Sequence, residues 1–166
     1  MLLLTQDLRA RLIANGKSRG DHMPIVKFFS PVGAATWLFS ELDEDGDILF
    51  GLCDLGFGCP EMGSASLAEI AAVTLPFGLT IERDLCFEGG FPLTIYADAA
   101  RLCGGITEDT ARLEAAAAAR AQEIAELPPP CPPRLRQTPR GIVPRGQPAP
   151  SSLPPKMPRG WGHPTE

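Results

Sequence analysis

Two apolar runs joined by a short acidic turn constrain the fold of this chain more than any other feature. The first run covers residues 35–42, the second covers residues 48–53, and Asp45-Gly46 lies between them. Aspartate and glycine tolerate the positive φ angles of a type I′ turn, so this pair favours a two-residue turn. We therefore predict a β-hairpin, and we expect the other elements to pack around it.

The position of the turn also predicts the register of the hairpin. It places Leu42 opposite Leu49, Glu41 opposite Phe50, and Phe39 opposite Leu52. Both faces are then apolar: one carries Leu38, Leu42, Leu49 and Cys53, and the other carries Trp37, Phe39, Phe50 and Leu52. Such a hairpin is either covered on both sides or keeps one face for a partner. We therefore consider Trp37, Phe39 and Phe50 as residues at or beneath a partner-binding surface.

Capping residues mark three helices around the hairpin. Thr5 is suited to start a first helix, which Asn15-Gly16 would end. Ser66 predicts a short helix over residues 67–73, with Glu69 in the capping-box position. Pro92 predicts a helix that runs to residue 103, because proline is well tolerated in a first helical turn.

Strand patterns occupy residues 25–29 and residues 79–87, the second with clean apolar and polar alternation. After the hairpin we expect an irregular crossing, since that part of the chain contains Gly56, Gly58, Pro60 and Gly63. Together these elements predict an α+β fold, in which helices flank a small antiparallel sheet of about four strands.

The composition changes abruptly near residue 127. Thirteen of the 18 prolines lie at or after Pro128. Residues 1–126 hold 9 Lys+Arg and 19 Asp+Glu, a net charge of −10, whereas residues 127–166 hold 6 and 1, a net charge of +5. We predict a core domain over residues 1–106, an alanine-rich helix capped by Thr107 over residues 107–127, and a disordered proline-rich tail over residues 128–166. The predicted apolar stripe of the alanine-rich helix is Leu113, Ala117, Ile124 and Leu127.

The start of the chain lacks the apolar core of a signal peptide, and no stretch approaches the length of a membrane span. The five cysteines are an odd number and include no CxxC pair, so we expect reduced thiols. These features predict a cytoplasmic protein with no membrane association.

Three successive motifs resemble a known bacterial family. They are VKFFSPVGAATWLFSELD, ILFGLCDLGFGCPEMGSASLAEI and FGLTIERDLCF. In order and spacing they are similar to the domain of unknown function 2958 family, over roughly residues 1–103. The resemblance implies a setting on plasmids and integrative elements, but it implies no reaction and no catalytic residues. Many members have aromatic residues where this chain has Ser64 and Ala65.

Acidic residues suggest one enzymatic alternative. Glu82 and Asp84 are two positions apart, so on a strand both carboxylates leave the same face. Such a pair, with further carboxylates nearby, could hold a divalent metal for a nuclease or another hydrolase. Alternation on a solvated strand face, with a basic partner, produces the same pattern without any metal.

Other clusters favour structural roles. The acidic residues 43–47 lack the spacing of an EF-hand loop, so a hairpin turn explains them better. Cys53, Cys59 and Cys86 have no histidine close in sequence, which disfavours a zinc site or a Cys–His nucleophile. We therefore predict no metal site and no cofactor.

The two halves of the chain suggest different partners. The basic tail could bind nucleic acid weakly through Arg134, Arg136 and Arg140. The acidic core disfavours direct binding to a DNA duplex but suits contact with a basic protein. The sequence therefore predicts a non-enzymatic accessory protein with an unknown protein partner, with the metal-dependent hydrolase and the nucleic-acid-binding tail as alternatives.

Overall fold

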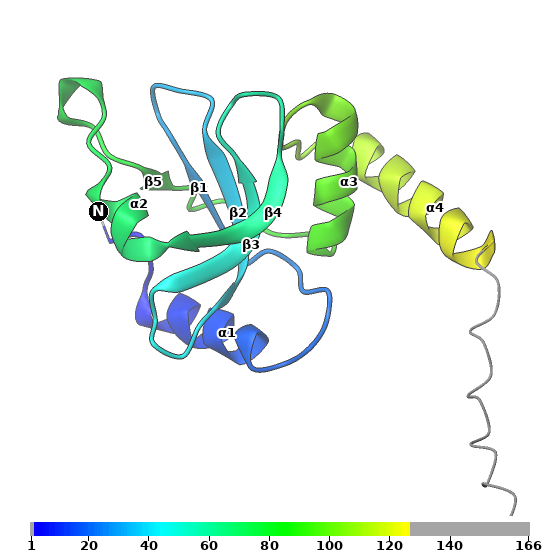
Figure 1. The fold of residues 1–166 in the computed structure, drawn as a ribbon, viewed down its shortest axis with the longest axis horizontal. Helices are drawn as coiled ribbons and strands as arrows, with labels where there is room; N and C mark the ends of the chain where they lie inside the picture. The colour runs from blue at the N-terminus through cyan, green and yellow to red at the C-terminus, as the bar shows by residue number, and fades with distance from the viewer. Residues whose placement is uncertain (1, 127–166) are drawn as a thin grey trace, which may run out of the picture. The chain divides into compact units, whose positions relative to one another are not determined.

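Strands β2 (Thr36–Leu42) and β3 (Ile48–Asp54) lie at the centre of an antiparallel sheet. The computed structural model describes residues 2–126 and orders the five strands β4-β3-β2-β1-β5. The other strands are β1 (Val26–Phe29), β4 (Glu61–Ser66) and β5 (Glu82–Arg83), and helices pack against the sheet (Figure 1). The α+β prediction is confirmed, with five strands in place of about four.

The turn between β2 and β3 differs from the predicted type. Gly46 has a φ angle of 82°, but the only non-glycine residue with a positive φ angle in residues 2–126 is Phe77. Asp45 therefore does not adopt the type I′ conformation. Instead, the Asp43 carboxylate accepts hydrogen bonds from the backbone N–H groups of Gly46, Asp47 and Ile48, at 2.9, 2.9 and 3.0 Å. The hairpin is confirmed, but a longer loop with an aspartate at its base joins the strands.

A β-bulge changes the predicted register in the first half of the hairpin. Leu42 lies opposite Leu49 and Glu41 opposite Phe50, as predicted. The register then shifts between Phe39 and Glu41, so Phe39 lies opposite Gly51 and not opposite Leu52. The extra residue is Ser40. Because side chains alternate along a strand, one extra residue moves every preceding side chain to the other face.

Because of the bulge, the predicted composition of the two faces is wrong for the residues of β2 that precede it. Trp37 and Phe39 share a core with Leu42 and Leu49, while Leu38 shares the opposite core with Leu52. The first core is covered by helix α1 (Gln6–Gly16), which begins after the predicted cap Thr5. The second is covered by helix α3 (Leu93–Cys103) and helix α4 (Thr110–Glu126).

Strand β4 occupies part of the expected irregular crossing. Gly56 and Gly58 do have positive φ angles, but from Glu61 onward the chain pairs regularly with β3. Helix α2 (Leu67–Ala72) follows directly, and the Ser66 side chain caps it by accepting a hydrogen bond from the Glu69 N–H at 3.1 Å. The cap was predicted, whereas the strand was not.

Strand β5 is much shorter than the predicted strand over residues 79–87. Ile81 is buried as the alternation predicts, but Leu85 is 67% exposed. The Asp84 side chain accepts a hydrogen bond from the Cys86 N–H at 2.9 Å, which turns the chain away from the sheet. The alternating pattern by itself indicated a continuous strand. A turn at an aspartate ends the strand inside that pattern.

The start and the buried stripe of the alanine-rich helix also differ from the prediction. Helix α3 begins after Pro92 and ends at Gly104 as expected. Helix α4, however, is capped by Asp109, whose carboxylate accepts a hydrogen bond from the Arg112 N–H at 3.1 Å. The hydroxyl group of the predicted cap, Thr107, accepts a hydrogen bond from the Asp109 N–H, just before the helix begins. Of the predicted stripe, Leu113 is buried and Ala117 packs against the core, whereas Ile124 is 61% exposed. Ala116 is buried as well, and Leu127 lies outside the described residues.

Two paired glycines provide a test of the central sheet. Gly51 lies opposite Gly63 across β3 and β4. A Cβ atom at Gly51 would stand 2.0 Å from the Leu38 carbonyl oxygen, whereas one at Gly63 would meet no atom within 4 Å. We expect Gly51→Ala to lower the free energy of unfolding by about 3 kcal/mol, because the backbone of β2 must move. Urea unfolding measures this change.

The matched control is Gly63→Ala, for which we expect a change below about 0.5 kcal/mol. Equal losses for the two variants would contradict the close approach of Gly51 to β2.

Candidate functional site

The aromatic residues predicted to mark a partner surface belong to the two cores. Phe39 is fully buried and Trp37 is 8% exposed. Phe50 is half-buried and packs against the core beneath α3 and α4. The chain's own helices cover both faces of the hairpin, so within the described residues the hairpin has no open apolar face. These three aromatic residues therefore no longer support a partner there.

Glu82 and Asp84 lie at the β5 edge of the sheet. The Lys27 ammonium group is 3.1 Å from an Asp84 carboxylate oxygen and also contacts the Glu108 carboxylate. Burial tends to lower the pKa of Lys27, but its hydrogen bonds to Glu108 and Asp84 outweigh burial and raise it. The hydrogen bond from the Cys86 N–H, together with Lys27, lowers the pKa of Asp84. Glu82 and Asp84 suggested a metal-binding pair in the sequence. In the structure, an ion pair and a turn explain the position of Asp84.

Some of the other acidic and thiol groups also have structural roles. In residues 2–126, no group of three or more His, Cys, Asp or Glu side chains is placed to hold a metal ion. Asp47 accepts hydrogen bonds from the Ala68 N–H and the Ser66 hydroxyl group, which lower its pKa. Cys53 is half-buried, and this burial raises the pKa of its thiol. Cys59, Cys86 and Cys103 are free and exposed.

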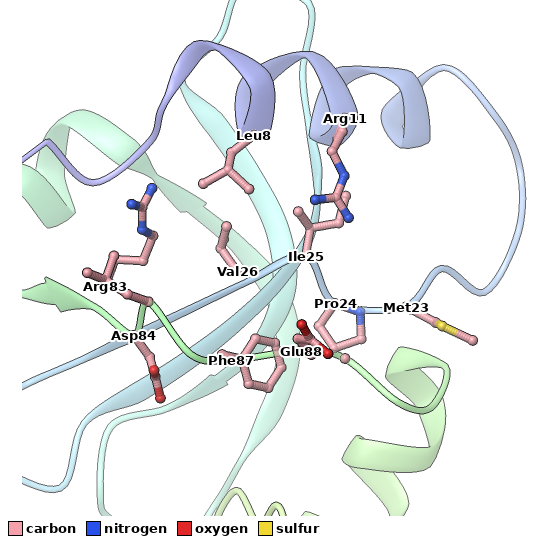
Figure 2. A pocket seen from close by; sticks show the side chains of 12 residues that line it. Leu8, Arg11, Met23, Pro24, Ile25, Val26, Arg83, Asp84, Phe87 and Glu88 are labelled. Atoms are coloured by element: carbon pink, nitrogen blue, oxygen red, sulfur yellow. The ribbon is translucent and has the colours of Figure 1, made fainter.

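A pocket of about 460 Å³ lies where α1 passes the β1 and β5 edge of the sheet (Figure 2). Leu8 and Val26 form its apolar centre, and Arg11 and Arg83 stand on opposite sides of them. Asp84 points away from Arg83 in this view. Sequence patterns could not find this pocket, because its walls come from segments that are far apart in the chain.

The pocket offers two guanidinium groups beside an apolar floor. The Arg83 Nη1 atom donates a hydrogen bond to the Leu3 carbonyl oxygen at 3.1 Å, which fixes that side chain to the N-terminal segment. Arg11 is exposed, and Glu88 is also among the lining residues. The lining also contains two carboxylates, those of Asp84 and Glu88. The pocket can accommodate a small apolar group beside a negative charge.

The most uniform chemical feature of the structure is its acidic central segment, which we define as residues 28–82. This segment contains nine Asp and Glu residues and no Lys, Arg or His. It supplies β2, β3, β4 and α2. Some of these carboxylates bind backbone N–H groups, as in Asp43 and Asp47, but Asp45, Glu61 and Glu69 are exposed. The acidic residues are thus continuous in sequence, and basic residues of α1 lie beside some of them, as Lys17 does in its ion pair with Glu44.

Comparison with protein families identifies the chain. The model of a family described as "Protein of unknown function (DUF2958)" matches residues 3–107. The chain belongs to this family. The match confirms the resemblance seen in the sequence and spans the sheet, α1, α2 and α3. No curated protein and no solved structure matches this DUF2958 member.

Two further expectations concern the membrane and the tail. No helix in the described part of the chain is long and apolar enough to cross a membrane. Arg134, Arg136 and Arg140, the predicted nucleic-acid contacts, lie outside the described residues 2–126. Nucleic-acid binding by the tail therefore stays a prediction from the sequence.

The ion pair at β5 predicts a specific pH dependence of stability. We expect Asp84→Asn to lower the free energy of unfolding by about 1 kcal/mol at pH 7, because the substitution removes the negative charge that pairs with Lys27. Since the folded protein lowers the pKa of Asp84, its contribution is present above the ordinary value of 3.8 and is lost as the pH falls below it. Thermal unfolding of both proteins between pH 2 and pH 7 measures the difference.

Glu82→Gln is the control, because the structure shows no ion pair for Glu82 among residues 2–126. A difference between Asp84→Asn and the original protein that stays constant down to pH 2 would show that the charge of Asp84 is not responsible.

Proposed function

We propose that this DUF2958 member is a non-enzymatic accessory protein that binds a basic segment of another protein. The observation that supports this proposal is the acidic central segment, with nine carboxylates and no Lys or Arg over residues 28–82. An excess of negative charge attracts a basic partner and speeds their association. The same charge repels a nucleic-acid duplex, so the partner we infer is a protein.

The family resemblance extends the proposal to a biological setting. We infer that the protein acts in the cytoplasm, in association with mobile genetic elements. Four free cysteines in the described residues are compatible with a reducing compartment. A partner that itself binds DNA would carry the basic surface that this acidic domain fits.

Affinity capture with the full-length protein tests the proposal. We expect proteins rich in Lys and Arg to be captured from host cells near 0.05 M NaCl and released by about 0.5 M NaCl, because salt screens charge pairs at a surface. A variant in which Asp45→Asn, Glu61→Gln and Glu69→Gln are combined should lose most of this capture. Mass spectrometry of the captured proteins gives the measurement.

The matched control removes the same number of charges from α4 through Glu114→Gln, Glu123→Gln and Glu126→Gln, all at exposed positions. This variant should capture partners normally. If both triple variants bind alike, or if the captured proteins resist high salt, the acidic central segment is not the binding surface.

A further inference from the structure

One edge of the sheet has no partner strand within the described part of the chain. The strand order places β4 at one end, where it pairs with β3 and with no other strand. Its six residues pair in unbroken register, from Glu61 opposite Cys53 to Ser66 opposite Ile48. The other edge is formed by the two-residue strand β5, which ends in the Asp84 turn. Only β4 therefore presents a long, regular edge.

The hydrogen bonds at the end of the ladder show which backbone groups of β4 face outward. The Leu67 N–H donates to the Asp47 carbonyl oxygen at 2.8 Å, which continues the pairing of β3 and β4 by one step. In an antiparallel pair, hydrogen-bonded positions alternate. Glu61, Gly63 and Ala65 therefore bond to β3. The N–H and C=O groups of Met62 and Ser64 point to the open side.

This edge lacks the features that normally protect a strand from pairing. Exposed edges are usually blocked by lysine, proline or a bulge. Residues 61–66 contain no lysine and no proline, and their register has no shift. The central side chains Gly63, Ser64 and Ala65 are small, so the backbone of another strand can approach closely. The edge is thus open both chemically and sterically.

The charge around this edge selects among possible strands. β4 lies within the acidic central segment, and Glu61 on the strand and Glu69 just after it are exposed. A second copy of the chain would bring a described domain of net charge −10 against another of the same charge. That repulsion disfavours self-pairing. A strand that carries Lys or Arg is complementary to the edge.

A hollow at the start of β4 provides room for a side chain of the added strand. It has a volume of about 510 Å³ and is lined by residues 58–62 together with Arg101. Peptides that add to a sheet gain affinity from main-chain hydrogen bonds, and they gain specificity from pockets for alternate side chains. Glu61 and Arg101 both line the hollow, so it offers one negative and one positive charge.

We propose that β4 accepts an extended, Lys- or Arg-bearing peptide segment of a partner protein as a sixth strand of the sheet. This inference takes the basic nature of the partner from the proposed function. What it adds is the place on the sheet where the partner binds. The outward backbone groups of Met62 and Ser64 form the main-chain hydrogen bonds, while Glu61 and Glu69 contact the basic side chains.

The probe is a phage-displayed library of random 12-residue peptides, selected on the full-length protein. We expect the selected peptides to carry Lys or Arg and to be free of proline over about six residues. For a selected peptide made synthetically, Ser64→Pro should weaken binding at least tenfold, because proline removes the outward N–H. Ser64→Ala keeps this N–H and should bind as the original protein does. Isothermal titration calorimetry measures both.

Ser64→Pro should leave the β3 ladder intact, since its N–H does not face β3, and circular dichroism with urea unfolding checks this. A second measurement needs no substitution: amide hydrogen exchange of the original protein with the peptide. The N–H groups of Met62 and Ser64 should become protected, while those on α4 should not change.

Several outcomes would overturn the inference. They are a peptide that binds Ser64→Pro normally, protection located elsewhere than β4, or selected peptides without Lys and Arg. Self-association through β4, seen by sedimentation and removed by Ser64→Pro, would also overturn the proposed occupant. In each case, capture of a basic protein that depends on Asp45, Glu61 and Glu69 would still support the proposed function, so the two failures are distinguishable.

Discussion

The pairing of β2 with β3 across Gly51 is the contact on which the rest of the structure depends. Only a residue without a side chain allows the Leu38 carbonyl oxygen to come so close to β3. The bulge at Ser40 lies beside this contact and reverses the faces of β2. As a result, Trp37 and Phe39 enter the core beneath α1, and Leu38 enters the core beneath α3 and α4. The reversal thus decides which apolar side chains of β2 each set of helices covers.

The acidic residues of the hairpin and of β4 have different physical roles, and Glu44 pairs with Lys17. Asp43, Asp47 and Asp54 bind backbone N–H groups, and the buried Asp54 reaches both Gly56 and Ile106. These carboxylates shape loops, fix the start of α2 and tie β3 to the segment between α3 and α4. The exposed Asp45 and Glu61 have no such bonds in the described part of the chain and give the surface its charge. A count of acidic residues from the sequence therefore overstates the charge available to a partner.

Local signals predicted much of the fold, because capping and turn chemistry act over a few residues. The helix starts after Thr5, Ser66 and Pro92 follow from side-chain and backbone preferences that sequence alone reveals. The bulge at Ser40 had no such signal, because the cross-strand contact at Gly51 decides the register. Strand β4 was missed because its small residues carry little apolar periodicity, and its pairing depends on β3.

The candidate sites were harder to predict, since they depend on contacts between distant segments. The sequence suggested a basic partner for the Glu82 and Asp84 pair, but only the fold shows that Lys27 holds Asp84 and Glu108 together. The aromatic side chains of the hairpin are buried in the two cores, where they pack beneath α1, α3 and α4. The open edge of β4 is a property of strand order, which no local pattern encodes.

Cys53 gives the central sheet a built-in reporter of its own opening. Its half-buried position on β3 raises the pKa of the thiol, so the reactive thiolate is scarce while the sheet is closed. Cys59, Cys86 and Cys103 are exposed. The rate at which an alkylating reagent modifies Cys53, compared with the rates for these three thiols, therefore reports how often the surroundings of Cys53 on β3 open under native conditions.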